Sequence, residues 1–146
     1  VKFSLVSPDG DMGFPGTVKI DVTYTLTDKN VLRVEYKAVT DKPTVINPTL
    51  HSYWNLAGED SGNVLKQELQ IFADEYSQVT AGLIPIKNIP VKGTPFDFTS
   101  PCVIGSRQQA VLADEATKPM DSWYDHNFVL RGKVGEMKKA AMMMYL

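Results

Sequence analysis

The sequence predicts an all-β protein, built as an antiparallel β-sandwich. Apolar and polar residues alternate without interruption from Val18 to Leu26, so one set of side chains faces a core and the other faces solvent. Nine prolines and ten glycines divide much of the remaining chain into short segments rich in β-branched and aromatic residues. Helical spacing is confined to two short stretches, which favours a sheet-rich domain.

The expected elements follow in chain order. Val1–Val6 begins as though within a strand, and Val18–Leu26 forms an antiparallel hairpin with the alternating segment Leu32–Ala38 across the turn formers Asp28, Lys29 and Asn30. Further strands are predicted over residues 65–73, 76–79, 84–91 and 128–130. Residues 110–116 could form a helical turn. Helical spacing recurs in the tail, at Met137, Ala140, Ala141 and Met144. The same residues could equally belong to a core segment that is either a helix or a strand. Without repeats or a low-complexity linker, residues 1–146 are expected to form one domain.

Composition excludes several functional classes. The net charge of −2 argues against a nucleic-acid partner. The sequence contains no run of about 18 apolar residues, the length that would predict a membrane-spanning helix. The single Cys102 cannot form an intrachain disulfide, and the distant His51 and His126 lack the spacing of a metal site, so no metal is expected. Val1–Val6 does not have the pattern of a signal peptide, which leaves the compartment open and slightly favours the cytoplasm.

Two polar clusters are not explained by the strand pattern. The first, Asn47–Gly58, places His51 beside Ser52, Tyr53 and Trp54, and the second, Trp123–Phe128, contains Asp125 between a tyrosine and an asparagine. A histidine can act as acid or base near neutral pH, but His51 could equally be a buried histidine among aromatic rings. The second cluster could equally be an Asx-type turn before a strand. Aromatic rings beside hydrogen-bonding groups are also what an amphipathic sugar needs.

These clusters carry a resemblance to a known family. Asn47–Gly58 (NPTLHSYWNLAG) resembles the histidine signature of the aldose 1-epimerases, or galactose mutarotases. Other stretches resemble that family in the same order, namely SPDG at 7–10, GFPG at 13–16, LIP at 83–85, GTPFDF at 93–98 and YDHNF at 124–128. The resemblance implies the galactose mutarotase-like supersandwich fold. It also implies interconversion of the α and β anomers of an aldohexose such as galactose or glucose, with no cofactor and no metal.

The same resemblance implies roles for individual residues. His51 would be the general acid, Ser52 and Tyr53 would contact the monosaccharide, and Asp125 would bind its hydroxyl groups. By the same resemblance, the family's arginine and second histidine would lie upstream of this chain, and the family's glutamate base would lie downstream. Glu136 is not expected to be that base. We therefore expect an incomplete sandwich that self-associates through exposed sheet edges. The alternative is a non-catalytic carbohydrate-binding or protein-interaction module that kept the epimerase fold.

Overall fold

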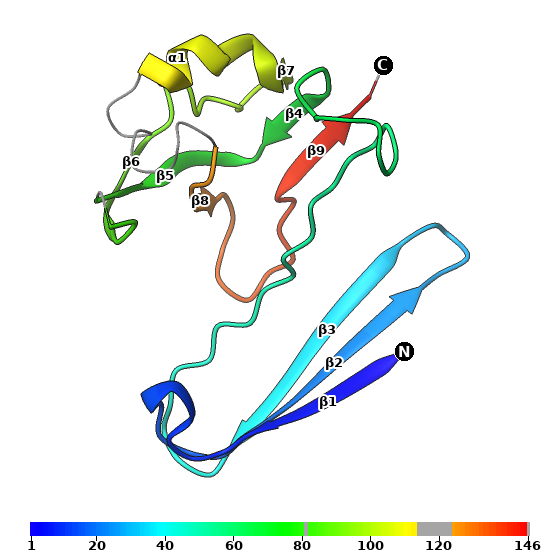
Figure 1. Cartoon of the computed structure of the whole chain (residues 1–146), viewed down its shortest axis with the longest axis vertical. Helices are drawn as coiled ribbons and strands as arrows, with labels where there is room; N and C mark the ends of the chain where they lie inside the picture. The colour runs from blue at the N-terminus through cyan, green and yellow to red at the C-terminus, as the bar shows by residue number, and fades with distance from the viewer. Residues whose placement is uncertain (81, 114–123, 146) are drawn as a thin grey trace. The chain divides into compact units, whose positions relative to one another are not determined.

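The computed structural model describes residues 1–80, 82–113 and 124–145, and they form two compact units, Val1–Tyr53 and Trp54–Leu146 (Figure 1). The strands of the described residues make three three-stranded sheets, in which every pairing is antiparallel. No helix in these ranges is long and apolar enough to cross a membrane. The organisation of residues 1–146 as one domain stays a prediction.

The first unit is a sheet of order β1-β2-β3, formed by β1 (Lys2–Ser7), β2 (Val18–Leu26) and β3 (Leu32–Thr40). The predicted hairpin is confirmed, and β2 has the predicted bounds. Its turn is closed by the Thr27 amide, which donates to the Val31 carbonyl at 3.0 Å. Asn30 adopts a φ of 57° there, a left-handed conformation that asparagine tolerates better than most residues.

One carboxylate connects the turn after β1 to the chain after β3. Asp9 accepts a hydrogen bond from the Lys42 ammonium at 2.5 Å and another from the Gly16 amide at 2.6 Å. The Lys42 contact, followed by the Gly16 amide, holds the pKa of Asp9 below its ordinary value. This turn also contains the short 3₁₀ helix η1 (Asp11–Gly13). Gly16 has a φ of +87°, and a Cβ on it would lie 2.8 Å from the Thr40 hydroxyl.

The second unit contains two sheets. In one, β4 (Glu68–Ile71) lies between β7 (Cys102–Val103) and β9 (Ala141–Met144). In the other, β5 (Ala73–Val79) lies between β6 (Pro85–Pro90) and β8 (Phe128–Leu130), and β8 has the predicted bounds. The single strand predicted over residues 65–73 is wrong, because Phe72 separates β4 from β5. The Phe72 amide donates to Ala140 and its carbonyl accepts from Arg131, so the chain passes here from one sheet to the other.

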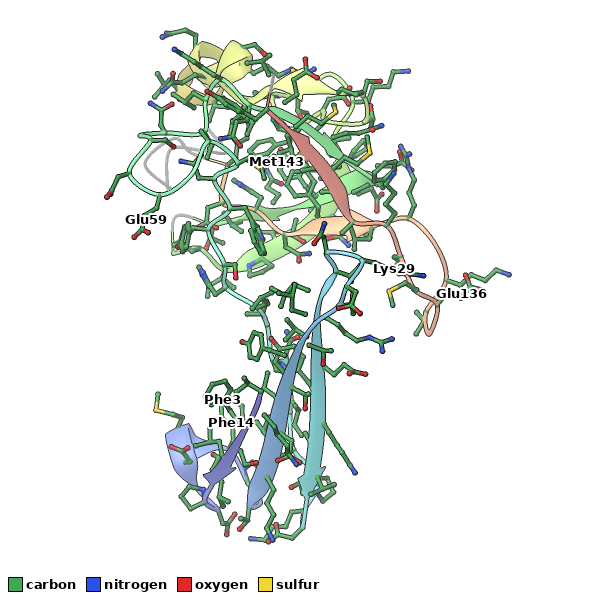
Figure 2. The ribbon with its side chains drawn as sticks, turned by 90° about the vertical axis from the view of Figure 1, so that its right-hand side faces the viewer. Phe3, Phe14, Lys29, Glu59, Glu136 and Met143 are labelled. Atoms are coloured by element: carbon green, nitrogen blue, oxygen red, sulfur yellow. The ribbon has the colours of Figure 1, made fainter. Side chains whose placement is uncertain are left out.

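The helical alternative for the tail is wrong, because Ala141–Met144 forms a strand against β4, with Met143 opposite Leu69. Met137, part of the helical spacing, is 95% exposed (the loop before β9 is visible in Figure 2). Pairing with a neighbouring strand outweighs the weak local preference of this segment. The predicted helical turn is present as α1 (Gln108–Ala113), which follows the 3₁₀ helix η2 (Ile104–Arg107). Residues 114–116 of that prediction lie outside the described residues.

An aromatic cluster forms the core of the second unit. Phe96 is fully buried and stacks on Tyr76 of β5, with ring centroids 4.3 Å apart. Val91 completes the buried centre, and Ile89, Tyr124 and Phe128 pack around it. These side chains come from β5, β6, β8 and the loops beside them, so the cluster joins segments that are far apart in sequence.

Replacing Gly16 with alanine should destabilise the first unit by about 2–3 kcal/mol. A positive φ costs a non-glycine residue about 1 kcal/mol, and the close contact with Thr40 adds a similar cost. Gly13→Ala is the matched control, since Gly13 also has a positive φ but a Cβ added to it would meet no atom within 4 Å. Hydrogen exchange of the β2 and β3 amides measures both variants. Equal protection losses would contradict the steric part of this explanation.

Replacing Phe96 with alanine should lower the free energy of unfolding by about 3–5 kcal/mol, because a large buried ring leaves a cavity. Ile86→Ala, at a β6 side chain that is 58% exposed, should cost less than about 1 kcal/mol. Urea denaturation followed by near-ultraviolet circular dichroism compares the two. Similar losses for both variants would show that the core lies elsewhere.

Candidate functional site

The polar cluster Asn47–Gly58, called the histidine cluster below, begins in extended chain after β3, and its residues up to Tyr53 belong to the first unit. His51, Ser52 and Tyr53 are all exposed and belong to no strand. The imidazole of His51 and the ring of Tyr53 lie 5.1 Å apart between centroids, at an interplanar angle of 39°. Residues two apart in extended chain point to the same side, which explains the pairing. The structure therefore presents an accessible imidazole beside an accessible phenol.

The second half of this cluster is anchored at the start of the second unit. Gln67 is 1% exposed, and its side-chain amide donates to the Asn55 side-chain oxygen at 2.7 Å. The Gln67 side-chain oxygen accepts from the Leu56 amide at 3.3 Å. Asn55 in turn donates to the Gly62 carbonyl at 3.1 Å. Gln67 was not among the residues predicted for the site, because a polar residue before a strand carries no signal of burial.

Asp125 lies in the second unit, in the segment that leads into β8. Its neighbours Tyr124 and His126 both pack against Phe96, with ring centroids at 5.8 Å and 4.4 Å. The carbonyl of Asn127 accepts from the Ser77 amide of β5 at 2.8 Å. Asp125 itself is exposed. The alternation of extended chain therefore directs the rings on either side of Asp125 into the core and its carboxylate to solvent.

The two histidines have different environments. His126 packs edge-on against Tyr76 at 5.4 Å as well as against Phe96, and both of its ring nitrogens are shielded from solvent. The sequence left open that His51 is buried among aromatic rings. Among the described residues, it is His126 that packs against aromatic rings, and His51 is the exposed histidine.

The phenylalanines of the GTPFDF motif belong to the packing of this region. Phe96 and Phe98 are buried, and the Asp97 carboxylate accepts from the Thr99 hydroxyl at 2.6 Å, the main cause of a pKa below the ordinary value. Arg107 donates to the Asp97 carbonyl oxygen and lies 5.5 Å from the Phe98 ring centroid. Burial raises the pKa of Tyr124, and the charge of Arg107 partly opposes that rise.

The structure brings two of the four predicted site residues into contact. His51 and Tyr53 are neighbours in the first unit, Ser52 lies between them in sequence, and Asp125 belongs to the second unit. A hollow of about 310 Å³ in the first unit is lined by none of the four, although Asn47 and Pro48 of the histidine cluster border it. In the ranges that the structure describes, no three potential metal-ligating side chains gather in one place.

Comparison with known proteins gives a consistent result. The family model for aldose 1-epimerase matches residues 1–144. The chain is 46% identical to the aldose 1-epimerase of Escherichia coli strain K12 over 142 residues, covering 97% of the chain and 39% of that protein. It is 43% identical to the galactose mutarotase of Homo sapiens over 133 residues, covering 90% of the chain and 36% of that protein.

Solved structures agree with these relatives. The galactose 1-epimerase of Lactobacillus acidophilus matches 99% of the chain with a TM-score of 0.85 and 32% identity, and the match covers 40% of that structure. The predicted antiparallel β fold of the galactose mutarotase type is confirmed. The chain spans about two fifths of the length of the relatives that it matches. Within that length, the family match runs almost from end to end, and the chain belongs to the aldose 1-epimerase family.

Proposed function

We propose that the protein is a mutarotase, which interconverts the α and β anomers of a free aldohexose such as galactose or glucose with His51 as general acid. The observation that carries the proposal is the difference between the two histidines. The histidine of the family signature is exposed, whereas the ring nitrogens of His126 are shielded within aromatic packing. Membership of the aldose 1-epimerase family supports this type of reaction. The accessible imidazole of His51 is a group that can donate the proton that the reaction needs.

The proposed reaction needs one acid and one base. A carboxylate base removes the proton of the anomeric hydroxyl, the electron pair on that oxygen forms the aldehyde carbonyl, and the bond from C1 to the ring oxygen breaks. The His51 imidazolium gives its proton to the departing ring oxygen. Rotation about the C1–C2 bond exposes the other face of the aldehyde, and reclosure with the roles reversed gives the second anomer. No electrons leave the sugar, so the reaction needs no redox partner.

Three further residues have side chains with the chemistry to hold a sugar. Tyr53 presents an exposed ring 5.1 Å from the His51 ring, a surface that can cover the apolar face of a pyranose. Ser52 offers a hydroxyl, and Asp125 offers an exposed carboxylate that can accept two hydrogen bonds from sugar hydroxyls. We assign the base to no residue of this chain. Glu136, on the loop between β8 and β9, is exposed and takes no part in the proposal (Figure 2).

His51→Ala should lower kcat/KM for mutarotation about 10²- to 10⁴-fold, the usual contribution of one general acid. The measurement is polarimetry of freshly dissolved α-D-galactose, with the protein expressed from its complete natural gene and the spontaneous rate subtracted. Glu136→Gln is the control and should leave the rate unchanged. Unimpaired catalysis by His51→Ala would remove the proposed acid. Galactose binding by the unsubstituted protein without any faster mutarotation would instead support a non-catalytic sugar-binding module.

Asp125→Asn should raise KM by roughly 10-fold or more while changing kcat less, because a charged hydrogen-bond acceptor for the sugar becomes a neutral one. The same polarimetric assay over a range of galactose concentrations separates the two constants. Glu75→Gln removes an exposed carboxylate from β5 and should change neither constant. Equal KM values for the Asp125 and Glu75 variants would show that Asp125 does not contact the sugar.

A further inference from the structure

Three polar side chains form a row across the sheet of β6, β5 and β8. Ser77 of β5 lies opposite Asn88 of β6, and its amide donates to the carbonyl of Asn127, the residue before β8, at 2.8 Å. The Ser77 hydroxyl donates to the Asn88 side-chain oxygen at 2.9 Å and accepts from the Asn127 side-chain amide at 3.3 Å. Ser77 is 8% exposed, whereas both asparagines are exposed. Two amide side chains therefore meet on one buried hydroxyl.

The hydroxyl of Ser77 fixes the orientation of the Asn127 side chain. A serine hydroxyl has one proton to donate, and here Asn88 accepts it, so only lone pairs are left for Asn127. Asn127 must then turn its NH₂ group toward the serine and its side-chain oxygen away from it. With the main-chain bond added, Ser77 holds Asn127 at two points. Two bonds from one residue restrict both the position and the rotation of the segment before β8.

The segment that Ser77 holds also carries Asp125. Asp125 lies two residues before Asn127, and side chains two apart in extended chain face the same side. Between them, the ring of His126 points to the other side and packs against Phe96, with ring centroids 4.4 Å apart. Ring packing presses a segment against the core but is non-directional, whereas a hydrogen bond constrains both distance and angle. The bonds from Ser77 therefore supply the direction that ring packing lacks.

We propose that Ser77 is a positioning residue for sugar binding, which sets the place of the Asp125 carboxylate by holding Asn127. The inference rests on the proposed function, in which Asp125 binds sugar hydroxyls. The groups of a binding site must be held within about 0.5 Å of the productive geometry, because the hydrogen bonds that they make weaken with distance and angle. Ser77 does not touch the sugar in this scheme, so its whole effect passes through Asp125.

A matched pair of substitutions isolates the Ser77 hydroxyl in the protein expressed from its complete natural gene. Ser77→Thr and Ser77→Val introduce side chains of nearly the same shape, and only Ser77→Thr keeps the hydroxyl. Ser77→Val should have a KM for galactose about threefold to tenfold above that of Ser77→Thr, the range expected for one hydrogen bond. The kcat values should agree within about twofold, because binding rather than chemistry is affected. Polarimetry measures both constants, and equal KM values for the two variants would overturn the proposal.

Ser106→Ala is the control for loss of a serine hydroxyl in the same unit. The Ser106 hydroxyl donates to the Val103 carbonyl at 2.6 Å, within the turn that contains η2, and makes no contact with the row at Ser77. This variant should change neither KM nor kcat. A rise in KM as large as that of Ser77→Val would show that any lost hydroxyl has the same effect, and it would overturn the specific role of Ser77.

A double-mutant cycle tests whether the effect passes through Asp125. In an Asp125→Ala background, Ser77→Thr and Ser77→Val should have KM values within about twofold of each other, because the group that Ser77 positions is gone. An undiminished difference in that background would overturn the proposal. An unchanged KM for Asp125→Ala alone would remove the proposed sugar contact, and this inference with it. A raised KM for Asp125→Ala, with no difference between the two Ser77 variants, would overturn the positioning role alone.

Hydrogen exchange tests the attachment of Asn127 without any sugar. The amide of residue 77 is protected by its bond to the Asn127 carbonyl, so loosening of that segment should expose it. After correction for intrinsic rates, this amide should exchange roughly fivefold faster in Ser77→Val than in Ser77→Thr. Equal exchange rates would show that Asn127 is held without the hydroxyl, which contradicts the proposed positioning.

Discussion

The stack of Phe96 on Tyr76 is the contact on which the second unit depends. Two rings with centroids 4.3 Å apart join the centre of β5 to the loop after β6, and His126 packs edge-on against both. Phe96 is fully buried in this cluster, and Ile89, Tyr124 and Phe128 pack around it. Asp125 is exposed because the residues on either side of it are committed to this cluster. The core thus determines where a polar residue can face solvent.

The first unit depends on a different kind of constraint. Its sheet is held by continuous β2–β3 pairing, and the Asp9 carboxylate closes the end of the sheet through Gly16 and Lys42. Many of its large apolar side chains are exposed, including Phe3 and Leu5 on β1. Within the described residues, the contacts that hold this unit together are the strand pairing and the turn contacts of Asp9. The histidine cluster follows directly, in extended chain that leaves His51 and Tyr53 accessible.

Much of the candidate site could be inferred from the sequence, because the family motifs are local. The pairing of His51 with Tyr53 follows from their spacing in extended chain, and the exposure of Asp125 follows from alternation between aromatic neighbours. The burial of Gln67 and its bonds to Asn55 could not be inferred, because they join residues twelve positions apart with no shared pattern. The shielding of the His126 ring nitrogens likewise depends on Phe96 and Tyr76, which are distant in sequence.

Sequence alone determined the elements in which a local rule is strong. Alternation with period two defined β2, and the turn residues before Leu32 defined the hairpin, because both depend on contacts between near neighbours. The tertiary structure decided the rest. Ala141–Met144 is a strand because β4 offers it an edge, and Phe72 ends a strand because its amide and carbonyl bond to different segments. Those choices depend on partners distant in the chain, whose positions no local pattern contains.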